Sequence, residues 1–206
     1  MRLGVMCSGE GTNFENIVHS CPKHEVVLMV YNKKKCGAKR RADLLDIPSV
    51  RIASKDEDQI IQIFEAYRVD IIVMAGWMRV MTKEFCDAFP GRIINLHPSL
   101  LPKYKGLHAI EQAIEAGEAQ TGCTVHFVNE HLDSGAIIKQ QEVPILPGDD
   151  VTGCTVHYVN EELDGGEIIL QAEVPILPED TVESLTKAIQ RKEYAILPHV
   201  INSWQS

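Results

Sequence analysis

Short apolar runs alternate with amphipathic segments through the first half of the chain, and this alternation constrains the fold most strongly. Residues 3–6, 26–31, 71–75 and 92–96 are short, mostly apolar runs, and the last two are typical of strands covered on both faces. Helical periodicity separates or follows them at residues 13–20, 38–45, 56–67, 82–89 and 108–116, and residues 182–203 form a predicted closing helix. The pattern predicts an α/β fold with a single, doubly wound, mainly parallel sheet.

The second half of the chain contains a tandem repeat. Residues 121–150 and 152–181 are identical at 22 of 30 aligned positions. Each copy has the pattern of a β-hairpin: an alternating strand (TVHFV or TVHYV), a turn with Leu-Asp, and a second apolar strand that ends at Val-Pro. Two copies are too few for a solenoid. We therefore expect one domain over residues 1–206, with duplicated antiparallel hairpin segments at 121–151 and 152–182.

The surplus hairpin would expose strand edges unless something covers them. It either extends the sheet or pairs with a second subunit, so a homodimer is one prediction. The alternative is an insertion that the domain tolerates without using it.

Charge and composition narrow the partners and the compartment. The chain has 29 acidic and 20 basic residues, and the net charge of −9 argues against a general nucleic-acid binder. Thirteen acidic residues and one basic residue fall between Glu130 and Glu183. The longest apolar run, residues 71–78, is too short for a membrane span. Six cysteines without a CxxC pair favour free thiols, so we predict a cytoplasmic chain without a membrane partner.

A glycine-rich turn follows the first predicted strand, with the sequence Ser8-Gly9-Glu10-Gly11-Thr12-Asn13. Such a strand-to-helix turn presents backbone N–H groups and the positive end of a helix, which together bind phosphate. The third glycine of a dinucleotide motif is absent, because Phe14 stands there. The turn therefore predicts a site for the phosphate of a small molecule, and a tight turn without a ligand is the alternative.

Asn95 and His97 end the predicted strand at residues 92–96, at the edge where open α/β sheets bind ligands. Alternation places both on one face, and Pro98 constrains the loop that follows. An amide donor beside an imidazole suits acyl transfer, because the amide stabilises an oxyanion while the imidazole moves a proton. A structural histidine beside an asparagine turn is the alternative.

The chain resembles the phosphoribosylglycinamide formyltransferase family of purine biosynthesis in two long segments, INLHPSLLPKYKGLHAIEQAIEAG and TGCTVHFVNEHLDSGAII. Three further motifs resemble the same family in the same order: SGEGTN, AGWMRVM and QRKEYAILP. The resemblance covers nearly the whole chain except one copy of the repeat. It implies the formyltransferase, Rossmann-like version of the predicted fold.

The resemblance also implies a reaction and a set of site residues. The formyl group of 10-formyltetrahydrofolate, a cosubstrate, would move to the primary amine of glycinamide ribonucleotide, with small molecules as partners and no metal. Asn95 would stabilise the oxyanion, while His97 and the aspartate of the LDxG turn would move a proton. Residues implied to bind the ribonucleotide are Gly11, Thr12, Asn13, Pro98, Gln190 and Glu193, and those implied to line the folate pocket are Met78, Arg79, Val80 and Met81.

The duplication offers two aspartates for the catalytic carboxylate, Asp133 and Asp164. The distance along the chain from His97 resembles the family arrangement for Asp133. Copy two has the more family-like residues, LDGG and IILQ, around Asp164. We prefer Asp133 on position, and Asp164 stays the alternative.

Two other functions are the alternatives to this reaction. A related folate-dependent formyltransferase, such as methionyl-tRNA formyltransferase or formyltetrahydrofolate deformylase, usually has an additional domain, for which 206 residues leave no room. A non-catalytic or impaired variant that binds folate or nucleotide would result if the duplication has displaced the carboxylate.

Overall fold

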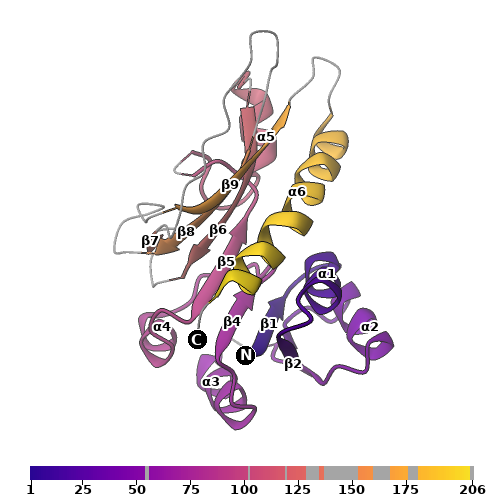
Figure 1. Cartoon of the computed structure of the whole chain (residues 1–206), viewed down its shortest axis with the longest axis vertical. Helices are drawn as coiled ribbons and strands as arrows, with labels where there is room; N and C mark the ends of the chain where they lie inside the picture. Colours follow the sequence, from indigo (N-terminus) through magenta and orange to yellow (C-terminus); the bar gives the residue numbers. More distant parts are fainter. Residues whose placement is uncertain are drawn as a thin grey trace.

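One mainly parallel sheet organises the protein (Figure 1). The computed structural model describes residues 1–53, 56–101, 103–118, 120–128, 135–136, 153–159, 168–175 and 181–204. Within these residues the strands are β1 (Arg2–Cys7), β2 (Glu25–Tyr31), β3 (Ser49–Arg51), β4 (Ile71–Met74), β5 (Ile93–His97), β6 (Gln120–Phe127), β7 (Gly135–Ala136), β8 (Gly153–Val159) and β9 (Ile168–Pro175). Their order in the sheet is β3-β2-β1-β4-β5-β6-β9-β8-β7. The first five strands are mutually parallel and β6 is antiparallel to β5, which confirms the predicted fold class.

Helices cover both faces of this sheet. They are α1 (Thr12–Ser20), α2 (Gly37–Leu44), α3 (Glu57–Ala66), α4 (Lys83–Ala88), α5 (Ala109–Glu115) and α6 (Val182–Ser203). One core cluster joins the sheet to α1, α2, α5 and α6, and a second joins it to α3 and α4. The protein is therefore doubly wound, as the alternation of the sequence predicts.

The strand β1 shows how the sequence builds the two layers. Leu3, Val5 and Cys7 point into the first cluster and Met6 into the second, as alternation along a strand requires. A side chain at Gly4 would lie 2.7 Å from the Phe64 ring, so glycine lets α3 pack closely on the strand.

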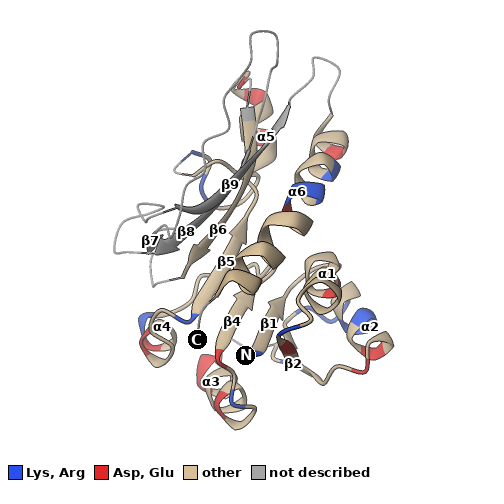
Figure 2. Ribbon diagram, viewed as in Figure 1, with Lys and Arg blue, Asp and Glu red and all other residues tan. Residues whose placement is uncertain are grey.

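Helices α2, α4 and α6 each contain both basic and acidic residues (Figure 2). Each of these helices has one pair four residues apart: Lys39 with Asp43, Lys83 with Asp87, and Lys187 with Glu183. Exposed pairs of this kind contribute little to stability, so the buried clusters hold the fold.

The second copy of the repeat extends the sheet in register with the first. Strand β8 runs parallel to β6, and each described partner lies exactly one repeat away, from Gly122 beside Gly153 to His126 beside His157. Strand β9 pairs antiparallel with both β8 and the start of β6. The second copy thus extends the sheet, while the return strand of copy one lies outside the described residues.

The structure differs from the sequence predictions at short elements and at one cysteine. Strands β3 and β7 have only three and two residues, too few to show a periodicity. Cys7, Cys21, Cys36 and Cys86 are free, but Cys123 is disulfide-bonded, so the prediction of free thiols is wrong there. The pairing of β6 with β8, which sets the backbone of Cys123 beside Cys154, could not be deduced from cysteine spacing.

Across the described part of the chain, no helix combines the length and hydropathy that a membrane span needs.

Candidate functional site

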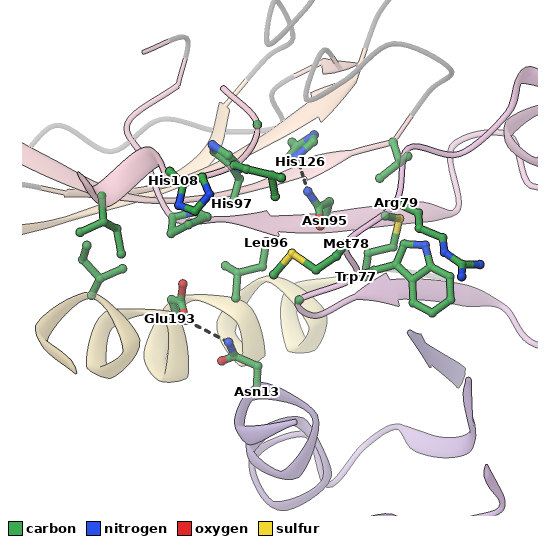
Figure 3. A pocket seen from close by; sticks show the side chains of 18 of the residues that line it. Asn13, Trp77, Met78, Arg79, Asn95, Leu96, His97, His108, His126 and Glu193 are labelled. Atoms are coloured by element: carbon green, nitrogen blue, oxygen red, sulfur yellow. Dashed lines mark hydrogen bonds between the residues drawn. The ribbon is translucent and has the colours of Figure 1, made fainter. Parts of the chain in front are cut away.

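A cavity of about 570 Å³ lies at the carboxyl ends of β4 and β5, where ligands bind in open α/β sheets (Figure 3). Its walls come from α1, the segment after β4, the end of β5 and the start of α5, β6, and α6. The predicted site residues that line it are Asn13, Met78, Arg79, Val80, Met81, Asn95, His97, Pro98, Gln190 and Glu193. Motifs that are far apart in the sequence therefore meet around one cavity.

Asn95 and His97 occupy alternate positions at the end of β5. Their neighbours Ile94 and Leu96 belong to one core cluster and Ile93 to the other, so Asn95 and His97 share the second face, as predicted. His97 is buried. Both line the cavity, which brings an amide and an imidazole to the same ligand space.

The loop after β5 fixes the imidazole ring of His97. His97 Nε2 lies 2.9 Å from the carbonyl oxygen of Tyr104, and since a carbonyl only accepts, Nε2 carries the hydrogen. Tyr104 has a left-handed backbone (φ 55°), and its hydroxyl donates to Glu118 Oε1 at 2.7 Å. Lys103 Nζ donates to the same oxygen at 2.7 Å, and these two donors hold the pKa of Glu118 below its usual value. The loop is thereby tied to the end of α5, with its carbonyl directed at His97.

The wall between α1 and α6 is polar and buried. Asn13 Nδ2 donates to Glu193 Oε2 at 2.9 Å (Figure 3). Burial raises the pKa of Glu193, and the hydrogen bond from Asn13 opposes that shift. Asn13 Oδ1 is buried and has no hydrogen-bond partner among the described residues. Two acceptors side by side require donors, so this wall suits a ligand with hydroxyl or amine groups.

The segment after β4 forms an apolar rim. Ser8 at the end of β1 anchors it, because Ser8 N–H donates to the Gly76 carbonyl and Ser8 Oγ accepts from Met78 N–H, each at 3.0 Å. Met78 and Val80 line the cavity although 55% and 52% of their surface is exposed. Exposed apolar side chains around a cavity are suited to the flat face of a ring system.

Two residues of the predicted phosphate turn, Gly11 and Thr12, stand immediately before Asn13 and do not line the cavity. Gly11 precedes α1 with φ 73°, and a Cβ there would lie 2.5 Å from the Cβ of Ala38. Only glycine fits this close approach of α2. The first N–H groups of α1 have no partners within the helix, so they are available to an anion beside the cavity.

The aspartates predicted for catalysis, Asp133 and Asp164, lie outside the described residues. Within the described residues, no cluster of three or more potential metal ligands occurs.

Comparisons with known proteins identify the family. A family model described as formyl transferase matches residues 1–152 and, separately, residues 146–201. A phosphoribosylglycinamide formyltransferase of Haemophilus influenzae is 40% identical over 157 residues, which cover 71% of this chain and 74% of that relative. The chain belongs to the phosphoribosylglycinamide formyltransferase family.

Relatives of this chain include longer proteins. The trifunctional purine biosynthetic protein adenosine-3 of Drosophila melanogaster is 43% identical over 159 residues, but the match spans only 12% of that relative. Among solved structures, the phosphoribosylglycinamide formyltransferase of Bacillus halodurans has a TM-score of 0.79 at 33% identity. That match covers 98% of this chain and 94% of the other.

The cavity is also lined by four residues for which the sequence predicts no role: Leu107, His126, Val128 and Thr186. Thr186 precedes Gln190 by four residues and Glu193 by seven, a helical spacing that could have placed it. His126 stands in the repeated TVH motif on β6, but only the pairing of β6 with β5 brings it to Asn95. Leu107 and Val128 show no such signal in the sequence.

Proposed function

We propose that this chain transfers a formyl group from 10-formyltetrahydrofolate to the amine of glycinamide ribonucleotide. The observation that carries the proposal is the convergence of Asn95 and His97 with the Asn13–Glu193 wall on one cavity, in a chain of this family. The curated relatives with this activity in their names support the choice of reaction.

The two substrates would occupy different walls. The buried acceptors of Asn13 and Glu193 suit the hydroxyl groups of a ribose, and the N-terminus of α1, with Gly11 and Thr12, suits its phosphate. Pro98 and Gln190 would complete this side. The segment of Met78, Arg79, Val80 and Met81, with the apolar rim that Met78 and Val80 form, suits the ring system of the folate.

The reaction then needs little from the protein beyond positioning and proton transfer. The amine nitrogen of the ribonucleotide attacks the formyl carbon, and an N–H of Asn95 stabilises the oxyanion of the tetrahedral intermediate. The bond from the formyl carbon to N10 of the folate breaks, and the proton lost by the amine reaches N10. His97 Nε2 donates to the Tyr104 carbonyl, so His97 would exchange a proton through Nδ1.

We assign the catalytic carboxylate to Asp133. Strand β6 pairs directly with β5, and Val128 just beyond its end lines the cavity. Asp133 follows Val128 by only five residues. Asp164 follows β8, whose described partners are β6, β7 and β9. The position of β6 therefore supports copy one as the source of the carboxylate.

The test is formyl transfer to glycinamide ribonucleotide by the wild type and by the variants Asp133→Asn and Asp164→Asn. We expect the wild type to be active and Asp133→Asn to lose about 100-fold or more in kcat, as for loss of a positioned proton-transfer group. A loss confined to Asp164→Asn would reverse the assignment. Folate or ribonucleotide binding by an inactive wild type would establish the non-catalytic alternative.

A further inference from the structure

His126 on β6 faces Asn95 across the pair of antiparallel strands. Asn95 and His126 are register partners, and directly opposite side chains in such a pair are close neighbours. Asn95 Nδ2 and His126 Nε2 are 2.8 Å apart (Figure 3). Both residues line the cavity, and His126 is 1% exposed.

A second hydrogen bond determines which ring nitrogen of His126 carries the hydrogen. His126 Nδ1 lies 2.9 Å from the carbonyl oxygen of Phe127. A carbonyl only accepts, so Nδ1 carries the hydrogen and Nε2 of the neutral ring is an acceptor. Asn95 must therefore present its nitrogen to the ring, because its oxygen would meet a lone pair. The Phe127 carbonyl thus sets, through His126, the orientation of the Asn95 amide.

This orientation matters for acyl transfer. An oxyanion is stabilised by an N–H donor and repelled by an amide oxygen. The amide nitrogen has two hydrogens, and the bond to His126 uses one while fixing the plane that contains the other. An amide free to rotate would spend part of its time with the wrong atom towards the reacting carbonyl.

We propose that His126 is a positioning residue that holds the Asn95 amide with its nitrogen as donor and thereby supports the chemical step. The proposal rests on the oxyanion-stabilising role proposed above for Asn95.

The duplication provides a matched control within the same chain. His157 occupies the position equivalent to His126 in copy two, on β8. The described partners of β5 are β4 and β6, so the register places His126, and not His157, opposite Asn95.

Steady-state kinetics of formyl transfer test the proposal with three variants. We expect His126→Ala to lower kcat at least about tenfold and up to about 100-fold, with little change in KM for either substrate, because misplaced catalytic groups cost that much. His126→Gln should recover most of this loss, since its side-chain oxygen can accept from Asn95. His157→Ala should keep wild-type kcat. Unchanged kcat in His126→Ala, or a loss that falls on His157→Ala, would overturn the proposal.

A double-mutant cycle separates positioning from a general structural role. If His126 acts through Asn95, His126→Ala should have no further effect on kcat in an Asn95→Ala background. Additive losses would contradict the proposal, and thermal unfolding of each variant measures any loss of folded protein.

The tautomer can be measured without activity. Nitrogen-15 NMR of the histidine rings should show His126 protonated at Nδ1 and unprotonated at Nε2, and Asn95→Ala should shift the Nε2 signal. An Nε2-protonated ring would refute the positioning of Asn95. A wild type that shows this tautomer but transfers no formyl group would refute the proposed reaction and leave the hydrogen-bond geometry intact.

Discussion

At the scale of single residues, the buried carboxylate of Glu193 shows that the site is not optimised for stability. Its side chain is buried and its described donor is Asn13 Nδ2. Burial raises its pKa, which means that the ionised form is disfavoured in the folded protein. The protein thus contains a carboxyl group at a position where burial disfavours its charge. This is consistent with the ribose-binding role proposed for Glu193.

Replacing Glu193 with Gln should therefore stabilise the protein at neutral pH. Because the folded-state pKa is raised above the usual 4.5, the contribution of Glu193 to stability is fully present below pH 4.5 and is lost as pH rises through the folded value. Each unit of the raised pKa removes about 1.4 kcal/mol at neutral pH. Urea unfolding should show Glu193→Gln to be more stable at pH 7 and equal at pH 4, while KM for the ribonucleotide rises.

Glu183 provides the control for this prediction, because it lies on the same helix and is exposed. A hydrogen bond from Lys187 lowers its pKa, so Glu183→Gln should slightly destabilise the protein at neutral pH. A stability difference for Glu193→Gln that does not change between pH 4 and pH 7 would contradict the ionisation argument.

At the scale of elements, a proline inside α6 is compensated by α1. Pro198 has no N–H, so the carbonyl of Tyr194 lacks its helical donor. Asn16 Nδ2 donates to that carbonyl at 2.8 Å and replaces the missing bond. Together with the Asn13–Glu193 bond and a bond from Asn202 to the Ser20 carbonyl, it ties α1 to α6.

Asn16→Ala should lower the free energy of unfolding by about 1–3 kcal/mol, because the partly buried Tyr194 carbonyl loses its donor. The cost should be smaller in a Pro198→Ala background, where residue 198 supplies the N–H. Asn16 also accepts a hydrogen bond from Ser20 Oγ. The substitution removes this bond in both backgrounds, so its loss cancels in the comparison. If urea unfolding gives equal costs in the two backgrounds, Asn16 does not act by replacing the N–H that Pro198 lacks.

The same elements show what sequence could predict. The sequence predicts helix α6 with its observed ends and places Asn95 and His97 on one face of β5, because both features depend on local periodicity. The contacts that orient these groups could not be predicted. Asn16 meets Tyr194, which is 178 residues away along the chain, and His126 meets Asn95 only through strand register. The left-handed turn at Tyr104 likewise depends on tertiary contacts, among them its bond to Glu118.

At the scale of the whole molecule, the sheet combines strands from both copies of the repeat. The start of β6 in copy one pairs with residues 173–175 of β9 in copy two, and the equivalent residues of copy one are Glu142, Val143 and Pro144. Both copies of the repeat therefore contain the residues that pair with the start of β6. The segment 152–182 contains seven acidic residues and no basic residue, so the duplicate carries most of the net charge of −9.

Deleting residues 152–182 should leave a folded, active formyltransferase. Glu142–Pro144 would take the place of β9 opposite β6, and Asp150 would replace Thr181 as the cap before α6, where aspartate caps as well as threonine. We expect the thermal midpoint to stay within a few degrees of the wild type or to rise, with kcat close to that of the full chain. Deleting residues 121–151 instead should also give an active chain, because copy two would follow Gln120 directly and supply its own histidine and aspartate. Loss of cooperative unfolding in both single-copy variants would show that the sheet needs β8, whereas loss in one alone would show that the copies are not interchangeable.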